Sequence, residues 1–299
     1  MIALPNEHRH ARTIAILAGT VIALLISLLA VGMHISLSLQ KEKLAQENNF
    51  LKKEEAVIVR SETEDKTIIV PIQEVLFEYV EVTGGCGAYF EDPCLNARSG
   101  PGTEYPVISK LRNGIVLKVG GKIERDGQTW YKIVFDEWIR YPERIKTDWY
   151  VAADYVRILL NEGNRESITK PGDTTTKRII VDRSDQTLSA YDGDELFMQE
   201  SISTGVELTP TPRGTFTIFK KTPSRYMQGP IPQITEKEYD LPGVPWNLYF
   251  TIDGAVIHGT YWHENFGKPS SNGCVNLPPA KAQKLYLWAE IGTKVIVQE

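Results

Sequence analysis

The strongest constraint on this chain is an uncharged apolar run near its N-terminus. Residues 14–33 read IAILAGTVIALLISLLAVGM. About 20 apolar residues, at ~1.5 Å rise per residue, cross the ~30 Å hydrocarbon core of a bilayer as one helix. The run is longer than a signal-peptide core, and VGMHIS at its end offers no convincing small-x-small cleavage site. We therefore expect a cytoplasmic tail over residues 1–13 and a retained transmembrane helix over residues 14–39.

The charges that flank this run do not agree with the usual orientation of an exported protein. Arg9 and Arg12 precede the run, and four lysines follow it at positions 41, 43, 52 and 53. A strict count of these charges places the long C-terminal part in the cytoplasm. Long domains translocate largely regardless of such counts, so the chemistry of the downstream residues has to decide the orientation.

The remaining composition is that of folded domains and argues against a nucleic-acid partner. Hydrophobic residues make up 42% and charged residues 24% of the 299 residues, which excludes a disordered chain and suits about two domains. The net charge of −5 opposes binding through neutralised phosphates. Residues 40–66 are rich in Lys, Glu and Gln and predict a solvated stalk or a loose spacer.

Two mostly β domains follow the stalk. Over residues 67–160, short β-branched and aromatic runs alternate with turns such as Asp126-Gly127, which predicts a small all-β barrel. Residues 161–176, NEGNRESITKPGDTTT, read as a linker. Over residues 177–299 the strand pattern resumes, and one helix is expected over residues 279–289, with Pro near its start.

The segment CLNARSGPGTEYPVISKLRNGIVLKV, followed by WYKIV and DWYVAADYVRIL, resembles a bacterial SH3-like domain over residues 75–158. The resemblance implies a small SH3-like β-barrel of the kind that accompanies cell-wall proteins. The stretch FDEWIRYPERIKTD, residues 135–148, is longer than the family's loop at that place. Its Trp138 and Tyr141 either line a ligand groove or pack within a covering loop.

The three cysteines divide into a close pair and a single residue. Cys86 and Cys94 can close a small disulfide loop if the chain is exported to an oxidising compartment. Cys274 is then a free thiol, either a small buried hydrophobic residue or a nucleophile. The chain has no Cys-x-x-Cys or His/Cys cluster, so we expect no metal site.

His258-Gly259 and Ser271-Asn272-Gly273-Cys274 together supply the groups that a thiol nucleophile needs. A free cysteine is mostly protonated at neutral pH, and an imidazole can take its proton. Gly273 lets the backbone approach a carbonyl closely, and its N–H and that of Cys274 are candidate donors to an oxyanion. Spacing alone leaves the buried-thiol interpretation open.

The motifs TPTPRGTFTI, PGVPWNLYFT and IHGTYWHENFGKPSSNGCVNL resemble the YkuD-type L,D-transpeptidase catalytic domain over residues 177–298. The resemblance implies a β-sandwich-like fold with one short helix after the nucleophile, no cofactor, and peptidoglycan stem peptides as substrate. It implies that Cys274 is the nucleophile, that His258 is the general base, and that the Gly259 carbonyl orients the imidazole. The flanks of the nucleophile motif match at Ser271, Gly273 and Asn276.

One position departs from the family pattern. The family motif is Ser-His-Gly-Cys, and this chain has Asn272 where the second histidine stands. An amide donates a hydrogen bond but cannot shuttle a proton. Three further residues are candidates for substrate contact, each with a plain alternative. His263 lines the acceptor side of the groove or lies in a solvated loop, Tyr249 contacts substrate or packs in the core, and Arg213 meets a stem-peptide carboxylate or is an exposed turn residue.

We therefore expect a single-pass bacterial cell-membrane protein with its catalytic domain outside the membrane, acting in cell-wall biogenesis and cell shape. The expected reaction is a 3→3 cross-link formed through a thioester on Cys274. Water as acceptor would make the protein an L,D-carboxypeptidase. A cysteine endopeptidase and a non-catalytic peptidoglycan-binding wall protein, the latter suggested by Asn272, remain as alternatives.

Overall fold

The computed structural model describes residues 56–60, 67–75, 77–160 and 175–299. The predicted transmembrane helix at 14–39 lies outside these residues, as does most of the predicted linker. Within the described residues no helix is long and apolar enough to cross a bilayer. Strands β1 (Ala56–Arg60) and β2 (Thr67–Pro71) form a two-stranded sheet, so the end of the segment expected as a stalk is an extended strand.

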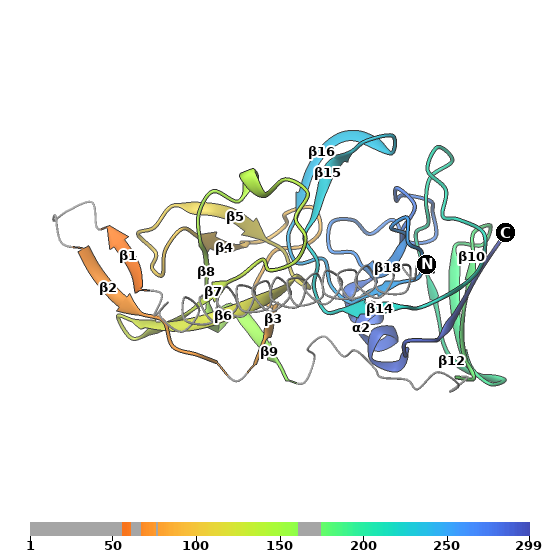
Figure 1. The fold of residues 1–299 in the computed structure, drawn as a ribbon, viewed down its shortest axis with the longest axis horizontal. Coiled ribbons are helices and arrows are strands. Elements are labelled where there is room, and N and C mark those ends of the chain that lie inside the picture. Colours follow the sequence, from red (N-terminus) through yellow and green to blue (C-terminus); the bar gives the residue numbers. More distant parts are fainter. Residues whose placement is uncertain (1–55, 61–66, 76, 161–174) are drawn as a thin grey trace, which may run out of the picture. The chain divides into compact units, whose positions relative to one another are not determined.

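The SH3-like domain is one seven-stranded sheet in the order β5-β4-β8-β7-β6-β3-β9. Its strands are β3 (Tyr79–Val82), β4 (Leu95–Arg98), β5 (Val107–Leu111), β6 (Val116–Arg125), β7 (Gln128–Ile133), β8 (Trp149–Ala152) and β9 (Val156–Leu159). The turn between β6 and β7 uses Asp126 and Gly127, both at positive φ as a tight hairpin requires. Alternate residues of these strands point inward and build an apolar core. In Figure 1 the sheet runs from β3 through the yellow strands β4 to β6 to the yellow-green strands β8 and β9.

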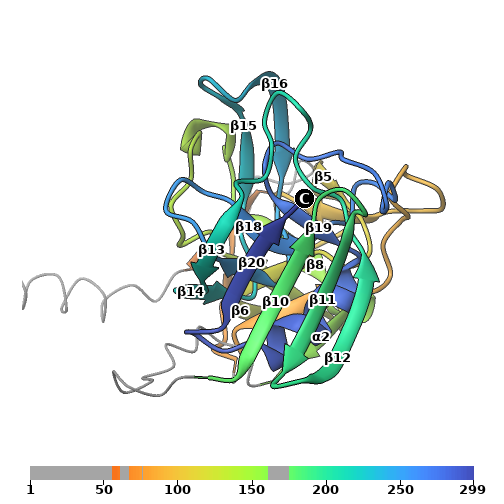
Figure 2. The same cartoon turned by 90° about the vertical axis from the view of Figure 1, so that its right-hand side faces the viewer.

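The second domain packs two sheets against each other. The five-stranded sheet has the order β12-β11-β10-β20-β13 and faces the viewer in Figure 2. Its strands are β10 (Lys177–Asp182), β11 (Thr187–Asp192), β12 (Glu195–Ser201), β13 (Gly214–Thr217) and β20 (Lys294–Gln298). The four-stranded sheet has the order β14-β17-β18-β19, with β14 (Lys220–Thr222), β17 (Asn247–Tyr249), β18 (Val256–Gly259) and β19 (Val275–Leu277).

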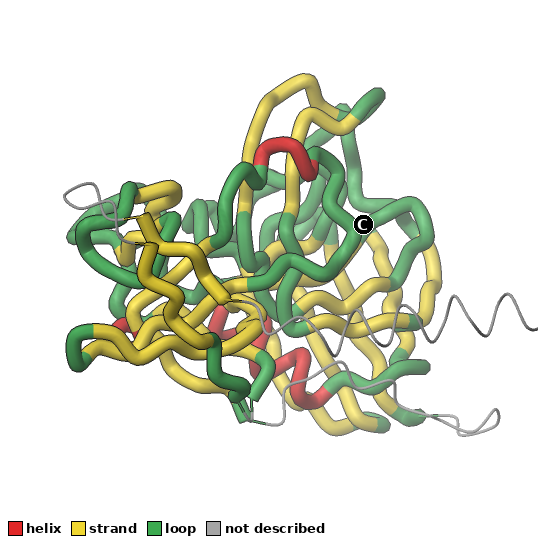
Figure 3. The backbone as a smooth tube through the Cα atoms, turned by 60° about the vertical axis from the view of Figure 1, so that its left-hand side comes forward, coloured by secondary structure: helices red, strands yellow, loops and turns green. Residues whose placement is uncertain are grey.

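One α-helix, α2 (Pro279–Trp288), closes the core of this domain. Ala282, Leu285 and Tyr286 recur at helical spacing and are all buried, as the sequence predicted. They pack with residues of both sheets, among them Ile179 and Ile257. Figure 3 shows that strands and loops make up nearly all of the described chain. The expectation of a mostly β, β-sandwich-like fold with one short helix after Cys274 is confirmed at this level.

A hairpin of β15 (Met227–Ile231) and β16 (Thr235–Leu241) stands apart from both sheets. In Figure 2 it rises above β18 and β19. The sequence did not predict it, because β16 reads TEKEYDL and has no apolar alternation. Met227 and Leu241 at its foot pack against the core of the SH3-like domain.

The two domains share packing and backbone hydrogen bonds. Val244 and Tyr261 of the second domain belong to the apolar core of the barrel. The N–H of Val116 donates to the carbonyl of Gly243 at 3.0 Å. A Cβ on Gly243 would lie 2.4 Å from the carbonyl oxygen of Val116, so the close approach requires glycine. The domains therefore contact each other directly over their apolar surfaces.

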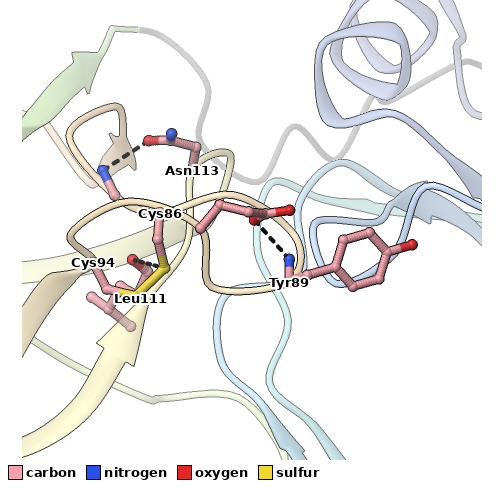
Figure 4. The surroundings of a disulfide bond; sticks show 7 residues. Cys86, Tyr89, Cys94, Leu111 and Asn113 are labelled. Atoms are coloured by element: carbon pink, nitrogen blue, oxygen red, sulfur yellow. Dashed lines mark hydrogen bonds between the residues drawn. A yellow bond between two sulfur atoms is a disulfide. The ribbon is translucent and has the colours of Figure 1, made fainter.

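Cys86 and Cys94 form a disulfide at the end of the barrel, and Cys274 is free. Figure 4 shows the closed loop, with the Tyr89 ring directed away from the sulfur atoms. The Tyr89 hydroxyl accepts a hydrogen bond from the N–H of Glu264 in the second domain, at 3.3 Å. The disulfide loop therefore contacts the segment that follows the His258-Gly259 motif.

Candidate active site

The candidate base and the candidate nucleophile belong to two neighbouring parallel strands: the base lies in β18, and the nucleophile directly precedes β19. His258 lies in β18 and is paired in register with Asn276 of β19. Cys274 lies two residues before Asn276, immediately ahead of β19. Because the register pairs Ile257 with Val275 and His258 with Asn276, Cys274 lies at the start of the same strand pair that carries His258. The fold thus brings the two motifs together across one strand pair.

The imidazole of His258 is oriented by its own strand. Its Nδ1 lies 3.0 Å from the carbonyl oxygen of Gly259. A carbonyl only accepts hydrogen bonds, so the ring proton lies on Nδ1 and Nε2 is free to accept a proton. Nε2 is buried without a hydrogen-bond partner among the described residues. Burial is the main cause that lowers the pKa of His258, from 6.5 to about 4.

The thiol of Cys274 lies near the backbone that precedes β18. Its Sγ lies 3.9 Å from the carbonyl oxygen of Gly254. Burial raises the pKa of Cys274, and the guanidinium of Arg225 and the N–H of Val256 oppose that rise. With the histidine pKa lowered and the cysteine pKa raised, the resting pair is a neutral thiol beside a neutral imidazole. Proton transfer then accompanies attack on a substrate, because no ion pair exists beforehand.

The loop before Cys274 is held by hydroxyl groups. Ser271 Oγ donates to the carbonyl of Cys274 at 2.6 Å and accepts from the N–H of Gly273 at 3.2 Å. The N–H of Gly273, expected as an oxyanion donor, is therefore engaged inside the loop. Gly273 has φ of 110°, which favours glycine. The N–H of Cys274 has no hydrogen-bond partner in the described part of the chain and is the remaining donor at this position.

His263 is buried and paired with Asn276, so it does not lie in a solvated loop. The N–H of Asn265 donates to its Nδ1 at 3.2 Å, which leaves the ring proton on Nε2. Nδ2 of the Asn276 amide lies 3.0 Å from Nε2, and with the ring proton on Nε2 the amide accepts that proton only when its oxygen and nitrogen ends are exchanged. Burial lowers the pKa of His263. The two side chains hold the 261–266 segment against β19.

Arg225 is a site residue that the sequence did not single out. It precedes the β15–β16 hairpin, and its positive charge lowers the pKa of both Cys274 and His258. Its guanidinium lies 5.6 Å from the ring centroid of Tyr249, a residue predicted to contact substrate. Burial is the main cause that raises the pKa of Tyr239 in β16, and negative charge on Cys274 is the next cause. No local motif marks Arg225, so only the fold could reveal it.

Four other candidates lie away from these contacts. Arg213 is exposed and pairs with Glu299 at 3.7 Å, near the end of β20. Asn272 is exposed and has no hydrogen-bond partner among the described residues. Trp138 is 72% exposed and lines a pocket of about 260 Å³ between the SH3-like domain and β14, whereas Tyr141 packs under the guanidinium of Arg144. The described residues contain no cluster of His, Cys, Asp or Glu arranged to hold a metal ion.

Two family models match the chain. Residues 176–297 match the L,D-transpeptidase catalytic domain, YkuD, and residues 95–157 match the bacterial SH3 domain, SH3_3. The curated protein "Putative L,D-transpeptidase YkuD" from Bacillus licheniformis is 30% identical over 139 residues, which are 44% of this chain and 74% of that protein.

Solved structures give matches of the same kind. The Ldtfm–avibactam carbamoyl enzyme is 28% identical, with a TM-score of 0.38, over 42% of this chain and 49% of that chain. The catalytic domain of the Enterococcus faecium L,D-transpeptidase acylated by ertapenem is 27% identical, with a TM-score of 0.37, over 42% of this chain and 100% of that domain. The chain thus spans about half the length of the first of these solved proteins.

Proposed function

Because the chain belongs to the YkuD-type L,D-transpeptidase family, we propose that it forms 3→3 cross-links between peptidoglycan stem peptides through a thioester on Cys274. The observation that carries this proposal is the state of His258. Its Nε2 is deprotonated, buried and without a partner among the described residues, beside the strand that leads from the free thiol of Cys274. A buried acceptor of this kind is poised to take a thiol proton.

The first half of the reaction forms the thioester. Cys274 Sγ attacks the carbonyl carbon of the third residue of a donor stem peptide, and its proton passes to His258 Nε2. The N–H of Cys274 donates to the oxyanion that develops. The C–N bond to the terminal D-amino acid then breaks, and His258 returns the proton to the leaving amine.

The second half transfers the acyl group. The side-chain amine of an acceptor stem peptide attacks the thioester carbonyl, His258 takes a proton from that amine, and the Cys274 thiol is released. A new amide bond joins two third-position residues, which is the 3→3 cross-link. Water in place of the amine gives the L,D-carboxypeptidase reaction.

This substrate lies outside the cytoplasmic membrane, and we propose the same location for both domains. The Cys86–Cys94 disulfide supports this location, because disulfides persist in oxidising compartments. The anchor over residues 14–39 stays a prediction from sequence. Protease added to intact spheroplasts should remove the part of the chain after about residue 40, and protection of that part would contradict the proposed location.

The direct test is mass spectrometry of the full chain after incubation with a tetrapeptide stem. We expect a covalent acyl adduct on Cys274 and release of the terminal D-amino acid. A carbapenem gives the simpler assay, since ertapenem acylates the E. faecium relative. The control is Cys274→Ser, in which thioester formation should be absent. A wild-type chain that acquires no adduct from either compound would contradict the proposal.

A second candidate function, a non-catalytic peptidoglycan-binding protein, is favoured by Asn272 in place of the motif histidine. The exposure of Asn272 weakens this candidate, because the residue touches neither His258 nor Cys274 through a hydrogen bond. The two functions differ in one measurable outcome. The binding protein retains affinity for purified sacculi but acquires no carbapenem adduct.

A further inference from the structure

Residues 135–148 of the SH3-like domain, named here the insertion loop, make specific contacts with the β15–β16 hairpin of the second domain. The N–H of Tyr141 donates to Gln228 Oε1 at 2.7 Å. Gln228 Nε2 donates in return to the carbonyl of Tyr141 at 3.2 Å. This two-way pair joins the loop to β15 as a strand partner would. Gln228 is buried, so loss of the bond from the Tyr141 N–H leaves its Oε1 unsatisfied, whereas its Nε2 also donates to Asp240 at 2.8 Å.

Arg144 of the insertion loop reaches both strands of the hairpin. Its guanidinium donates to the carbonyl of Gly229 in β15 at 2.7 Å and to the carboxylate of Asp240 in β16 at 3.2 Å. A guanidinium presents several donors in one rigid plane, which suits contacts in two directions. The ring of Tyr141 stacks under this group at 4.1 Å, and its hydroxyl donates to the carbonyl of Pro230 at 2.8 Å.

The base of the hairpin is held by the same loop. Glu137 Oε1 accepts from the N–H of Tyr226, the residue before β15, at 2.8 Å. The ring of Phe135 lies 5.1 Å from the ring of Tyr226. The hydrogen bonds that join the hairpin to the rest of the chain thus come mainly from the insertion loop.

The hairpin in turn presents groups to the nucleophile. Tyr239 of β16 packs flat against β15, since a Cβ on Gly229 would lie 2.3 Å from its ring. In Figure 2 the hairpin rises above β18 and β19, the strand that carries His258 and the strand that follows Cys274. At its foot, the carbonyl of Pro245 accepts from the N–H of Gly259 at 2.8 Å, which ties this part of the chain to β18. Arg225, two residues before β15, is fixed by a pair of backbone hydrogen bonds with Val244. A shift of the hairpin would therefore move Arg225 and Tyr239 relative to β18 and β19.

We propose that the insertion loop is part of the substrate site, and that Tyr141 and Arg144 are positioning residues that hold the β15–β16 hairpin beside Cys274 for binding of the stem peptide. This inference rests on the proposed function, because it assigns the loop to the same reaction. The SH3-like domain then contributes to catalysis by holding the hairpin in position, and a substitution in the insertion loop alters the affinity for substrate.

The test compares Arg144→Gln with Lys146→Gln in the full chain with detergent present. Both variants remove one positive charge from the insertion loop, but Lys146 is exposed and makes no ion pair in the described part of the chain. We expect Arg144→Gln to raise the KM for a tetrapeptide stem about tenfold with kcat within about twofold, and Lys146→Gln to match the wild type. Alkylation of Cys274 by iodoacetamide should not slow in either variant, because the nucleophile is untouched.

Tyr141→Phe is the second variant, since it removes one hydroxyl and preserves the ring. We expect it to raise KM about threefold and to speed hydrogen exchange in residues 227–241 alone. Equal KM values for Arg144→Gln, Tyr141→Phe and Lys146→Gln, with an active wild type, would overturn the inference and leave the proposed function standing. Parallel loss of alkylation and turnover would also overturn it, because the nucleophile itself would have changed. A wild type that acquires no acyl adduct would instead refute the proposed function, and this inference with it.

Discussion

Lowering the pH should destabilise the fold because His258 is buried in its neutral form. The variant His258→Gln separates this effect from those of other titratable groups. The side chain is 1% exposed, and burial lowers its pKa from 6.5 to about 4. Between these two values the unfolded chain binds a proton that the folded chain excludes. The free energy of unfolding is therefore highest above the unfolded pKa and falls as the pH drops toward the folded one.

The size of this effect follows from the gap between the two pKa values. A gap of about 2.5 pH units corresponds to roughly 3 kcal/mol. Between pH 7.5 and 5, about 2 kcal/mol of that is lost. Glu137 works in the opposite direction, because burial raises its pKa to about 7 and its contribution improves as the pH falls. A single wild-type curve would therefore mix the two effects.

The variant His258→Gln retains Glu137 and removes only the imidazole. We would measure urea-induced unfolding of residues 57–299, the compact unit that contains both domains, at pH 7.5 and 5. The stability of the wild type relative to the variant should fall by about 2 kcal/mol between these pH values. An unchanged difference would refute the reasoning, since it would mean that the imidazole takes up its proton in the folded protein as easily as in the unfolded one.

Three further outcomes are expected. Replacing both Cys86 and Cys94 with Ser should lower the free energy of unfolding by about 2.5 kcal/mol, because the unfolded chain loses a closed loop; urea titration checks this, and no loss would contradict a disulfide in the folded protein. Arg225→Gln should slow carbapenem acylation about tenfold, since no cation then favours the Cys274 thiolate; an unchanged rate of mass shift would exclude that role. Asn272→His should change the same rate by less than about tenfold, because Asn272 is exposed; an adduct that appears only in the variant would show that the natural chain has lost the activity.

The sequence predicted the parts of the site that lie in continuous motifs. The helix over α2 follows from apolar residues at helical spacing, whereas the roles of His258 and Cys274 rest on the resemblance of their motifs to a family. The structure places His258 in β18 and Cys274 immediately before the neighbouring strand β19. The engagement of the Gly273 N–H by Ser271 could not be predicted, because it depends on the rotamer of a hydroxyl group. Arg225 could not be predicted either, since a single arginine before a hairpin carries no pattern.

The β15–β16 hairpin and the contact between the domains were missed for a related reason. The residues of β16 are mostly exposed, so apolar and polar residues do not alternate along its sequence as they do in a strand with one buried face. The polar segment at 161–176 predicts a linker and gives no sign of how the two domains contact each other. Their actual contact runs through positions far from that segment, such as Gly243 against Val116, which only the tertiary fold brings together.

The approach of Gly243 to Val116 constrains how this chain can change over evolutionary time. Recombination within the linker would join each domain to a partner domain from another protein. Any residue other than glycine at position 243 would then collide with the carbonyl of residue 116. Val244 and Tyr261 would also lose the apolar neighbours that cover them. We therefore expect the barrel and the catalytic domain to be inherited together. A barrel taken from another protein would need matching substitutions on both surfaces of the contact between the domains.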